Sequence, residues 1–220
     1  MSDLEGRRPL KVRELGISQA AAHWLSQRNI TPNQISIASV GFGAAAATCL
    51  LMLPGAVGWQ TWGLALLAAL AIQCRLLCNL FDGMVAVEGA KSTASGELFN
   101  DIPDRIADPL ILVCAGYAVS SVPWAPDVGW AAGLLAVMTA YVRTLASSIG
   151  AKTDFRGPMA KQHRMALMTA ALVLTSFESF FWPQGTMVLI ALLVIVAGAL
   201  ITIARRVRAA YLFLEAKDAV

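Results

Sequence analysis

The chain has 220 residues and a formal net charge of +3, and 57% of its residues are hydrophobic whereas only 14% are charged. Soluble domains average about 45–50% apolar and about 25% charged residues. The composition therefore excludes an ordinary soluble domain and predicts an integral membrane protein. We expect its surroundings to be membrane lipids and expect no nucleic-acid partner.

The apolar stretches follow one another without a linker rich in Pro, Ser, Gly or charge, so we expect residues 1–220 to form a single membrane domain. Residues 10–28 come first and are amphipathic. Their apolar and polar residues alternate at helical spacing, and Trp24 suits the headgroup boundary. This pattern predicts an N-terminal amphipathic juxtamembrane helix that lies at the membrane interface.

Thr31-Pro32-Asn33 marks the start of the next helix, with Thr31 as N-cap and Pro32 at the first helical position. Each apolar segment that follows is about as long as the ~20 residues needed to cross a bilayer, or longer. The expected fold is an all-α polytopic bundle over residues 30–205. Its six transmembrane helices are expected at residues 34–53, 57–87, 98–122, 128–149, 165–181 and 186–203.

Lys and Arg occur before the first span and after the sixth, and in the connections between spans two and three and between spans four and five. The other connections, around Pro54, Pro123 and Pro183, have none. The positive-inside rule therefore predicts that both termini face the cytoplasm, in an inner membrane of bacterial type. Tryptophans mark the opposite ends of the spans, as an interfacial belt does: Trp59, Trp62, Trp124, Trp130 and Trp182.

Polar residues gather on the inner turns of the second and third spans. Asn79 and Asp82 are three residues apart and Asn100 and Asp104 are four apart, so each pair shares a helix face. If the two spans are antiparallel, the pairs reach the same depth. Such a group of hard oxygen ligands suits a divalent cation such as Mg²⁺.

Charges in a spanning segment cost a few kcal/mol each and often mark a substrate or ion path. The alternative is a set of internal ion pairs, Arg75 with Asp82 and Arg105 with Asp101 or Asp108. Small residues on the polar face favour a ligand, because they leave space beside the carboxylates for a phosphate group. They are Gly83, Ala86 and Gly96.

A second basic group lies near the end of span four and in the connection that follows it. Two interpretations stay open: a loop that touches anionic headgroups, or a pocket for a phosphate. The residues are Arg143, Lys152, Arg156, Lys161 and Arg164.

The polar run resembles the signature of the CDP-alcohol phosphotransferases: Asp, two residues, Asp-Gly, two residues, Ala-Arg, about eight residues, Gly, three residues, Asp, three residues, Asp. Asp82-Gly83, Ala86, Gly96 and Asp104 match it at its spacing, and the resemblance extends over residues 30–205. It departs at Asn79 and Asn100, where the family has Asp, and at Val87, where the family has Arg.

The resemblance implies a set of roles. Metal ligands would be Asp82, Asn79, Asn100 and Asp104, with Mg²⁺ or Mn²⁺ as cofactor, and Asp104 would be the catalytic base. The resemblance further implies a nucleotide and diphosphate site, to which the residues Thr31, Asn33, Gly83, Ala86, Gly96 and Arg75 are assigned. The basic group would hold an acceptor phosphate, and the resemblance also implies a homodimer.

The leading hypothesis is a phospholipid-biosynthetic transferase that moves a phosphatidyl group from a CDP-activated lipid, CDP-diacylglycerol, to a small polar alcohol and releases CMP. The alternative is a catalytically impaired relative that binds nucleotide-lipid or acts as a scaffold, and the departures at Asn79, Asn100 and Val87 motivate it. A small transporter or channel fits less well, because its polar residues should occupy the full membrane depth.

Overall fold

A computed structural model of the chain describes residues 16–28, 30–88, 95–151, 157–178 and 181–218. The described residues form seven α-helices and one short 3₁₀ turn, Leu53–Gly55. This confirms the predicted all-helical class. The helices are α1 (Gly16–Gln27), α2 (Pro32–Met52), α3 (Trp59–Glu88), α4 (Gly96–Tyr117), α5 (Ala125–Ser148), α6 (Lys161–Glu178) and α7 (Thr186–Asp218).

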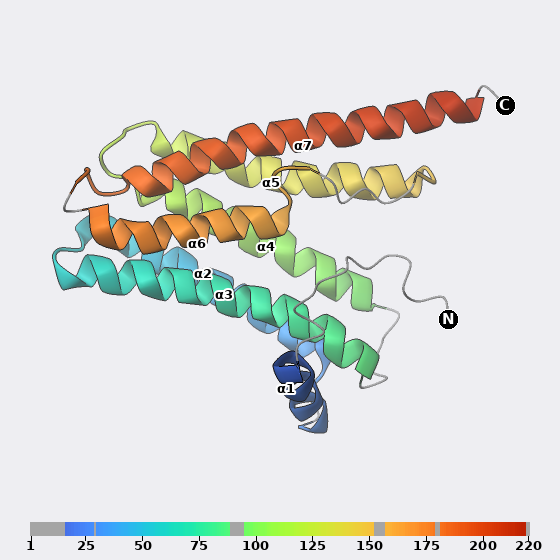
Figure 1. The fold of residues 1–220 in the computed structure, drawn as a ribbon, viewed down its shortest axis with the longest axis horizontal. Coiled ribbons are helices and arrows are strands. Elements are labelled where there is room, and N and C mark those ends of the chain that lie inside the picture. Colours follow the sequence, from blue (N-terminus) through green and yellow to red (C-terminus); the bar gives the residue numbers. More distant parts are fainter. Residues whose placement is uncertain (1–15, 29, 89–94, 152–156, 179–180, 219–220) are drawn as a thin grey trace.

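The six long helices form a closed ring. In ring order α2 packs on α4, α4 on α5, α5 on α7, α7 on α6, α6 on α3 and α3 again on α2. Figure 1 shows these helices running lengthwise, with α1 set across one end of α2 and α3. Because α4 also contacts α7 across the ring, the core is continuous and mainly aliphatic.

The start of α2 forms as predicted. The hydroxyl of Thr31 accepts a hydrogen bond from the backbone N–H of Gln34 at 3.3 Å. The Gln34 side chain in turn accepts one from the backbone N–H of Thr31 at 3.0 Å. This capping box, with Pro32 in the first turn, satisfies backbone donors that the helix itself leaves unpaired.

Among the described residues, four helices are long and apolar enough to cross a membrane. They are α2, α3, α5 and α7. Helix α4 has 22 residues and α6 has 18, and every 18-residue stretch of either helix holds at least three charged residues, among them Asp104 and Asp108 on α4 and Arg164 on α6. That α4 and α6 also cross the membrane, which would give six spans in all, therefore remains a prediction.

Several helix bounds differ from the predicted spans. Helix α6 begins at Lys161 rather than at 165, and α7 continues to Asp218 rather than ending near 203. Hydropathy detects only the apolar part of a helix, whereas backbone hydrogen bonding continues through its polar ends. The first part of the predicted amphipathic helix, residues 10–15, lies outside the described residues, and α1 covers the rest.

Small residues bring α4 close to its neighbours. A Cβ atom added to Gly43 of α2 would lie 2.8 Å from the Cβ of Ala107 on α4. On the other side of α4, a Cβ on Gly116 would lie 2.9 Å from the Cα of Gly129 on α5. Helix α4 is thus in close backbone contact with α2 on one side and α5 on the other. These contacts fix the position of its charged residues along the bundle.

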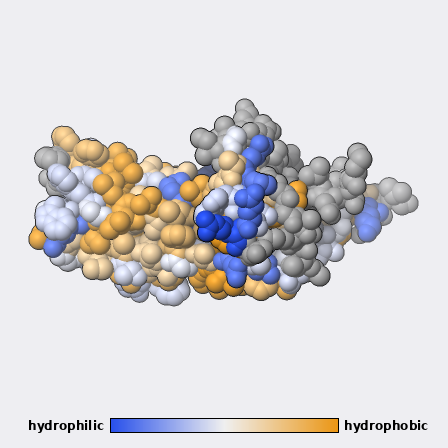
Figure 2. Space-filling model, turned by 90° about the horizontal axis from the view of Figure 1, so that it is seen from below, coloured by the Kyte–Doolittle hydropathy of each residue, from blue (hydrophilic) through white to orange (hydrophobic). Residues whose placement is uncertain are grey.

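Figure 2 shows one face of the molecule, on which hydrophobic residues cover much of one half while strongly hydrophilic residues gather near the middle. Large apolar side chains on α3 are about half exposed, among them Leu66, Leu67 and Leu70. In a water-soluble protein such a surface would be unusual. It is the surface that a lipid-facing bundle requires.

Candidate functional site

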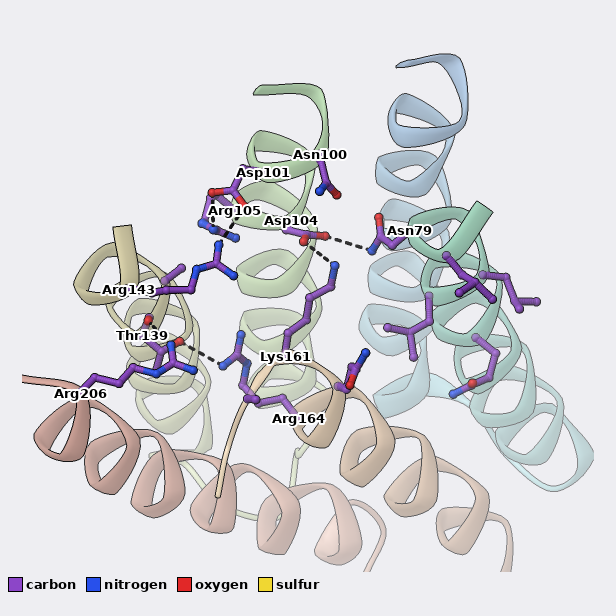
Figure 3. Close-up of a pocket in the computed structure, with 17 residues that line it drawn as sticks. Asn79, Asn100, Asp101, Asp104, Arg105, Thr139, Arg143, Lys161, Arg164 and Arg206 are labelled. Carbon is purple, nitrogen blue, oxygen red and sulfur yellow. Dashed lines mark hydrogen bonds and ion pairs between the residues drawn. The ribbon is translucent and has the colours of Figure 1, made fainter. Parts of the chain in front are cut away.

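The described residues enclose a cavity of about 530 Å³ between α3, α4, α5, α6 and α7. Its polar lining comes from five different helices, and Figure 3 shows these side chains pointing toward one another. The labelled lining residues are Asn79, Asn100, Asp101, Asp104, Arg105, Thr139, Arg143, Lys161, Arg164 and Arg206.

Asp104, on α4, is the most heavily contacted carboxylate of the cavity. Its Oδ1 atom accepts hydrogen bonds from Arg75 Nη2 at 2.8 Å and from the Asn79 side-chain amide at 3.0 Å. Its Oδ2 atom forms an ion pair with the ammonium group of Lys161. Asp104 is only 6% exposed, so these contacts form largely out of water.

Asp108 lies one helical turn beyond Asp104 and joins the same network. Arg75 Nη2 is 2.7 Å from its Oδ1 atom, and Arg164 Nη2 donates to its Oδ2 atom at 3.0 Å. Arg164 also donates to the hydroxyl of Thr139 at 3.2 Å, which connects α6 to α5. Arg75 is 0% exposed.

The structure decides between the internal ion pairs expected from the sequence. The pair of Arg75 with Asp82, which belonged to the alternative of internal ion pairs, is wrong, since Arg75 contacts Asp104 and Asp108 instead. The spacing on α3 placed Arg75 and Asp82 near one another, but both Asp104 and Asp108 approach Arg75 from α4. The predicted pair of Arg105 with Asp101 is confirmed, at 2.7 Å.

Asp82 of α3 is 4% exposed and faces α2. The hydroxyl of Ser36 donates a hydrogen bond to its Oδ2 atom at 2.6 Å, and Asp82 makes no ion pair within the described residues. One turn earlier, the Oδ1 atom of Asn79 is buried and has no hydrogen-bond partner among the described residues. A buried acceptor without a donor calls for a ligand, a water or an ion.

The predicted site residues divide into two groups. Six line the cavity: Asn79, Asn100, Asp104, Arg143, Lys161 and Arg164. Another seven are described but do not line it: Thr31, Asn33, Arg75, Asp82, Gly83, Ala86 and Gly96. Lys152 and Arg156 lie outside the described residues. The roles assigned to all of them remain predictions.

The sequence interpretation missed Arg206 as a cavity residue. It is 6% exposed, and its Nη1 atom donates to the backbone carbonyl of Thr139 at 2.6 Å. From the sequence, Arg206 is only one of the positive charges that follow the sixth span. Helical spacing was the signal that could have found it, because it follows the small residues Gly198 and Thr202 at four-residue intervals on one face of α7.

These residues do not fit two divalent cations. No group of three or more His, Cys, Asp or Glu side chains gathers as a metal site in the described part of the chain. Both oxygens of Asp104 already receive protein donors, two of them cationic. The residues do fit a single cation near Asp82 and Asn79. Among the described residues, the two oxygens of Asp82 accept only neutral donors, from the Ser36 hydroxyl and the Gly83 backbone N–H, and the side-chain oxygen of Asn79 has no partner. Both side chains offer hard oxygen ligands from one helix face.

No protein-family model and no curated protein sequence matches the chain. Solved structures with a similar fold do exist, among them those of the phosphatidylinositol phosphate synthase PgsA1 of Mycobacterium tuberculosis. Its complex with CDP-DAG superposes with a TM-score of 0.74 at 18% identity, covering 90% of this chain and 94% of that one.

The PgsA1 complex with manganese and citrate gives a TM-score of 0.73 at 17% identity, covering 88% of each chain. The apo form gives 0.70 at 17% identity, covering 87% of this chain and 95% of that one. Each superposition covers at least 87% of both chains, so most of the fold is shared. The chain has the fold of this phosphatidylinositol phosphate synthase.

Proposed function

We propose that this protein is a membrane transferase that moves a phosphatidyl group from a CDP-activated lipid, CDP-diacylglycerol, to a small polar alcohol and releases CMP. The observation that carries the proposal is the cavity itself, in which a buried carboxylate network meets several cationic side chains. The same fold in PgsA1 has CDP-DAG bound, which supports the choice of donor.

The cationic lining suits a diphosphate and the negative charge that develops as it is cleaved. Lys161, Arg143 and Arg164 reach the cavity from two helices, and guanidinium groups match phosphate oxygens in pairs. We assign Arg143 and Arg164 to a phosphate of the acceptor. Preorganised charges of this kind stabilise a transition state without reorganising during the reaction.

In the proposed reaction the hydroxyl oxygen of the acceptor attacks the β-phosphorus of the CDP-lipid. The new P–O bond forms, the bond to the bridging oxygen breaks, and CMP leaves with that oxygen. Asp104, which lines the cavity, accepts the hydroxyl proton. A single Mg²⁺ or Mn²⁺ held by Asp82 and Asn79 would supply charge neutralisation at the diphosphate.

We further propose that α4 and α6 cross the membrane with the four apolar helices, giving six spans with the cavity and both termini at the cytoplasmic side of a bacterial-type inner membrane. Asp104 and Asp108 of α4 and Arg164 of α6 face the ring rather than the lipid, since each is at most 6% exposed. Charges in spanning helices typically face the bundle interior. Homodimer formation also remains part of the proposal.

The test uses the purified protein in nanodiscs with CDP-diacylglycerol, Mg²⁺ or Mn²⁺, and pooled acceptors: glycerol 3-phosphate, serine, inositol, inositol phosphate and glycerol. We expect metal-dependent release of CMP, lost in Asp82→Asn and Asp104→Asn. Asp127→Asn is the matched control, since Asp127 is an exposed carboxylate in the first turn of α5 and does not line the cavity. Folded protein that releases no CMP with any acceptor would refute the proposal.

Binding without turnover is the second candidate function. Asn79 and Asn100 line the cavity without the negative charges that the family signature has at these positions. Val87, which is 57% exposed and does not line the cavity, lacks the positive charge of the signature arginine. Calorimetry that detects CDP-lipid binding while CMP release is absent would favour this alternative. Turnover that disappears in Asp82→Asn would exclude it.

A further inference from the structure

The network of charged side chains at the cavity contains more cations than carboxylates. Within the part of the chain that the structure describes, Arg75, Lys161 and Arg164 form ion pairs with two carboxylates, Asp104 and Asp108. The group therefore carries one net positive charge before any ligand binds. Both carboxylate side chains are at most 8% exposed, so solvent screens this excess weakly.

Lys161 is the cation of this group with the most access to the cavity. Its side chain is 27% exposed, whereas those of Arg75 and Arg164 are 0% and 5% exposed. Figure 3 shows its side chain extending from α6 toward Asp104, to which a dashed line joins the ammonium group. It contacts the Oδ2 atom of Asp104, while Arg75 and Asn79 share the Oδ1 atom. Both oxygens of the Asp104 carboxylate are thus in contact with donors from the protein.

Lys161 is held in this place by the chain that precedes it. Met159 donates its backbone N–H to the hydroxyl of Thr202 on α7 at 3.1 Å. A Cβ on Gly198 of α7 would lie 2.9 Å from the Met159 side chain, so the two segments are in close contact. The first turn of α6 starts directly afterwards, with Arg164 donating its backbone N–H to Ala160 at 3.1 Å. Lys161 is therefore anchored at the N-terminal end of a rigid helix.

We propose that Lys161 is a built-in counter-cation: its ammonium group takes the position at Asp104 that a divalent cation would otherwise take, and it contributes positive charge to the bound phosphate group. The site then accepts a metal only at Asp82 and Asn79. This inference rests on the proposed function in one respect, namely that the cavity receives a phosphate.

The electrostatics explain why the chain does not need a second metal. A divalent cation at Asp104 would raise the net charge of the group from one to three positive charges, within a few ångströms of Arg75 and Lys161. Repulsion between like charges at such distances is strong where water is excluded. A diphosphate has the opposite effect, because its negative charge offsets the excess. The resident cations thus favour the substrate over a second metal.

The test counts bound Mn²⁺ per chain, by elemental analysis and by electron paramagnetic resonance of protein equilibrated in detergent. Asn100 also lines the cavity and its side chain is exposed, so Asn100→Asp adds a carboxylate near Asp104. We expect Asn100→Asp alone to bind no more Mn²⁺ than the parent, because Lys161 remains. The double variant Asn100→Asp with Lys161→Ala should bind about one additional Mn²⁺ per chain.

Asn100→Asp with Lys161→Arg is the matched control, which keeps the positive charge and should not gain the ion. Thermal unfolding and size-exclusion profiles show whether each variant is folded, and if Lys161→Ala is not, Lys161→Met keeps most of the side-chain volume. An extra Mn²⁺ in Asn100→Asp alone, or none in the folded double variant, would overturn the proposal. The number of Mn²⁺ ions bound per chain is measured without reference to CMP release. A failure of the transferase proposal can therefore be distinguished from a failure of the proposal for Lys161.

Discussion

Replacement of Arg75 by Met tests whether the buried network stabilises the ring of helices. Arg75 is 0% exposed and contacts both Asp104 and Asp108, so Met would fill much of the volume but leave two buried carboxylates short of a cation. Removal of one partner from a buried ion pair costs about 3–5 kcal/mol. For a chain of this size that corresponds to a fall in Tm of about 6–20 °C.

Arg105→Met is the control, because Arg105 pairs with Asp101 where both side chains are partly exposed, at 27% and 43%. Such a pair contributes about 0–1 kcal/mol. Thermal unfolding of both variants in the same detergent gives the comparison. Addition of Asp108→Asn to Arg75→Met should restore part of the loss, since it removes one uncompensated charge. Equal Tm values for the Arg75 and Arg105 variants would refute the reasoning.

Two further predictions concern packing and a helix end. Gly43→Ala should destabilise by about 1–3 kcal/mol, because the new Cβ would meet Ala107 at 2.8 Å. Gly41→Ala, with nothing within 4 Å, should instead gain up to about 1 kcal/mol in helix propensity, and equal effects in thermal unfolding would contradict the model of close α2–α4 contact. Glu178→Gln should cost about 1–3 kcal/mol, because the carboxylate is 1% exposed and accepts the backbone N–H of Gly185 at 2.7 Å before α7. An unchanged Tm for Glu178→Gln would show that this helix start does not depend on the carboxylate.

Local chemistry made much of the fold predictable. The capping box at Thr31 depends on side chains only three residues apart, so the start of α2 could be placed from the sequence. Runs of apolar residues marked the helices, although their polar ends, as in α7 beyond 203, escaped detection. The four-residue interval likewise predicted that Asn100 and Asp104 share one face of α4.

The partners of the charged residues were not predictable in the same way. Whether Arg75 pairs with Asp82 or with the carboxylates of α4 depends on how closely α4 approaches α3 and α2. The close contact between Gly43 of α2 and Ala107 of α4 sets part of that distance. Lys161 and Arg206 reach the cavity from segments 57 and 102 residues beyond Asp104 in the chain. No local sequence pattern encodes contacts between residues that lie so far apart along the chain.

The sequence by itself determined the membrane class, the helical content, the capped start of α2 and the shared helix face of Asn79 and Asp82. These follow from composition and from interactions within one or two turns. Only the tertiary structure decided that Asp104 is enclosed by Arg75, Asn79 and Lys161, while Asn79 keeps an unpartnered oxygen. The physical reason is that ion pairing depends on distances between helices, which arise when the whole ring packs.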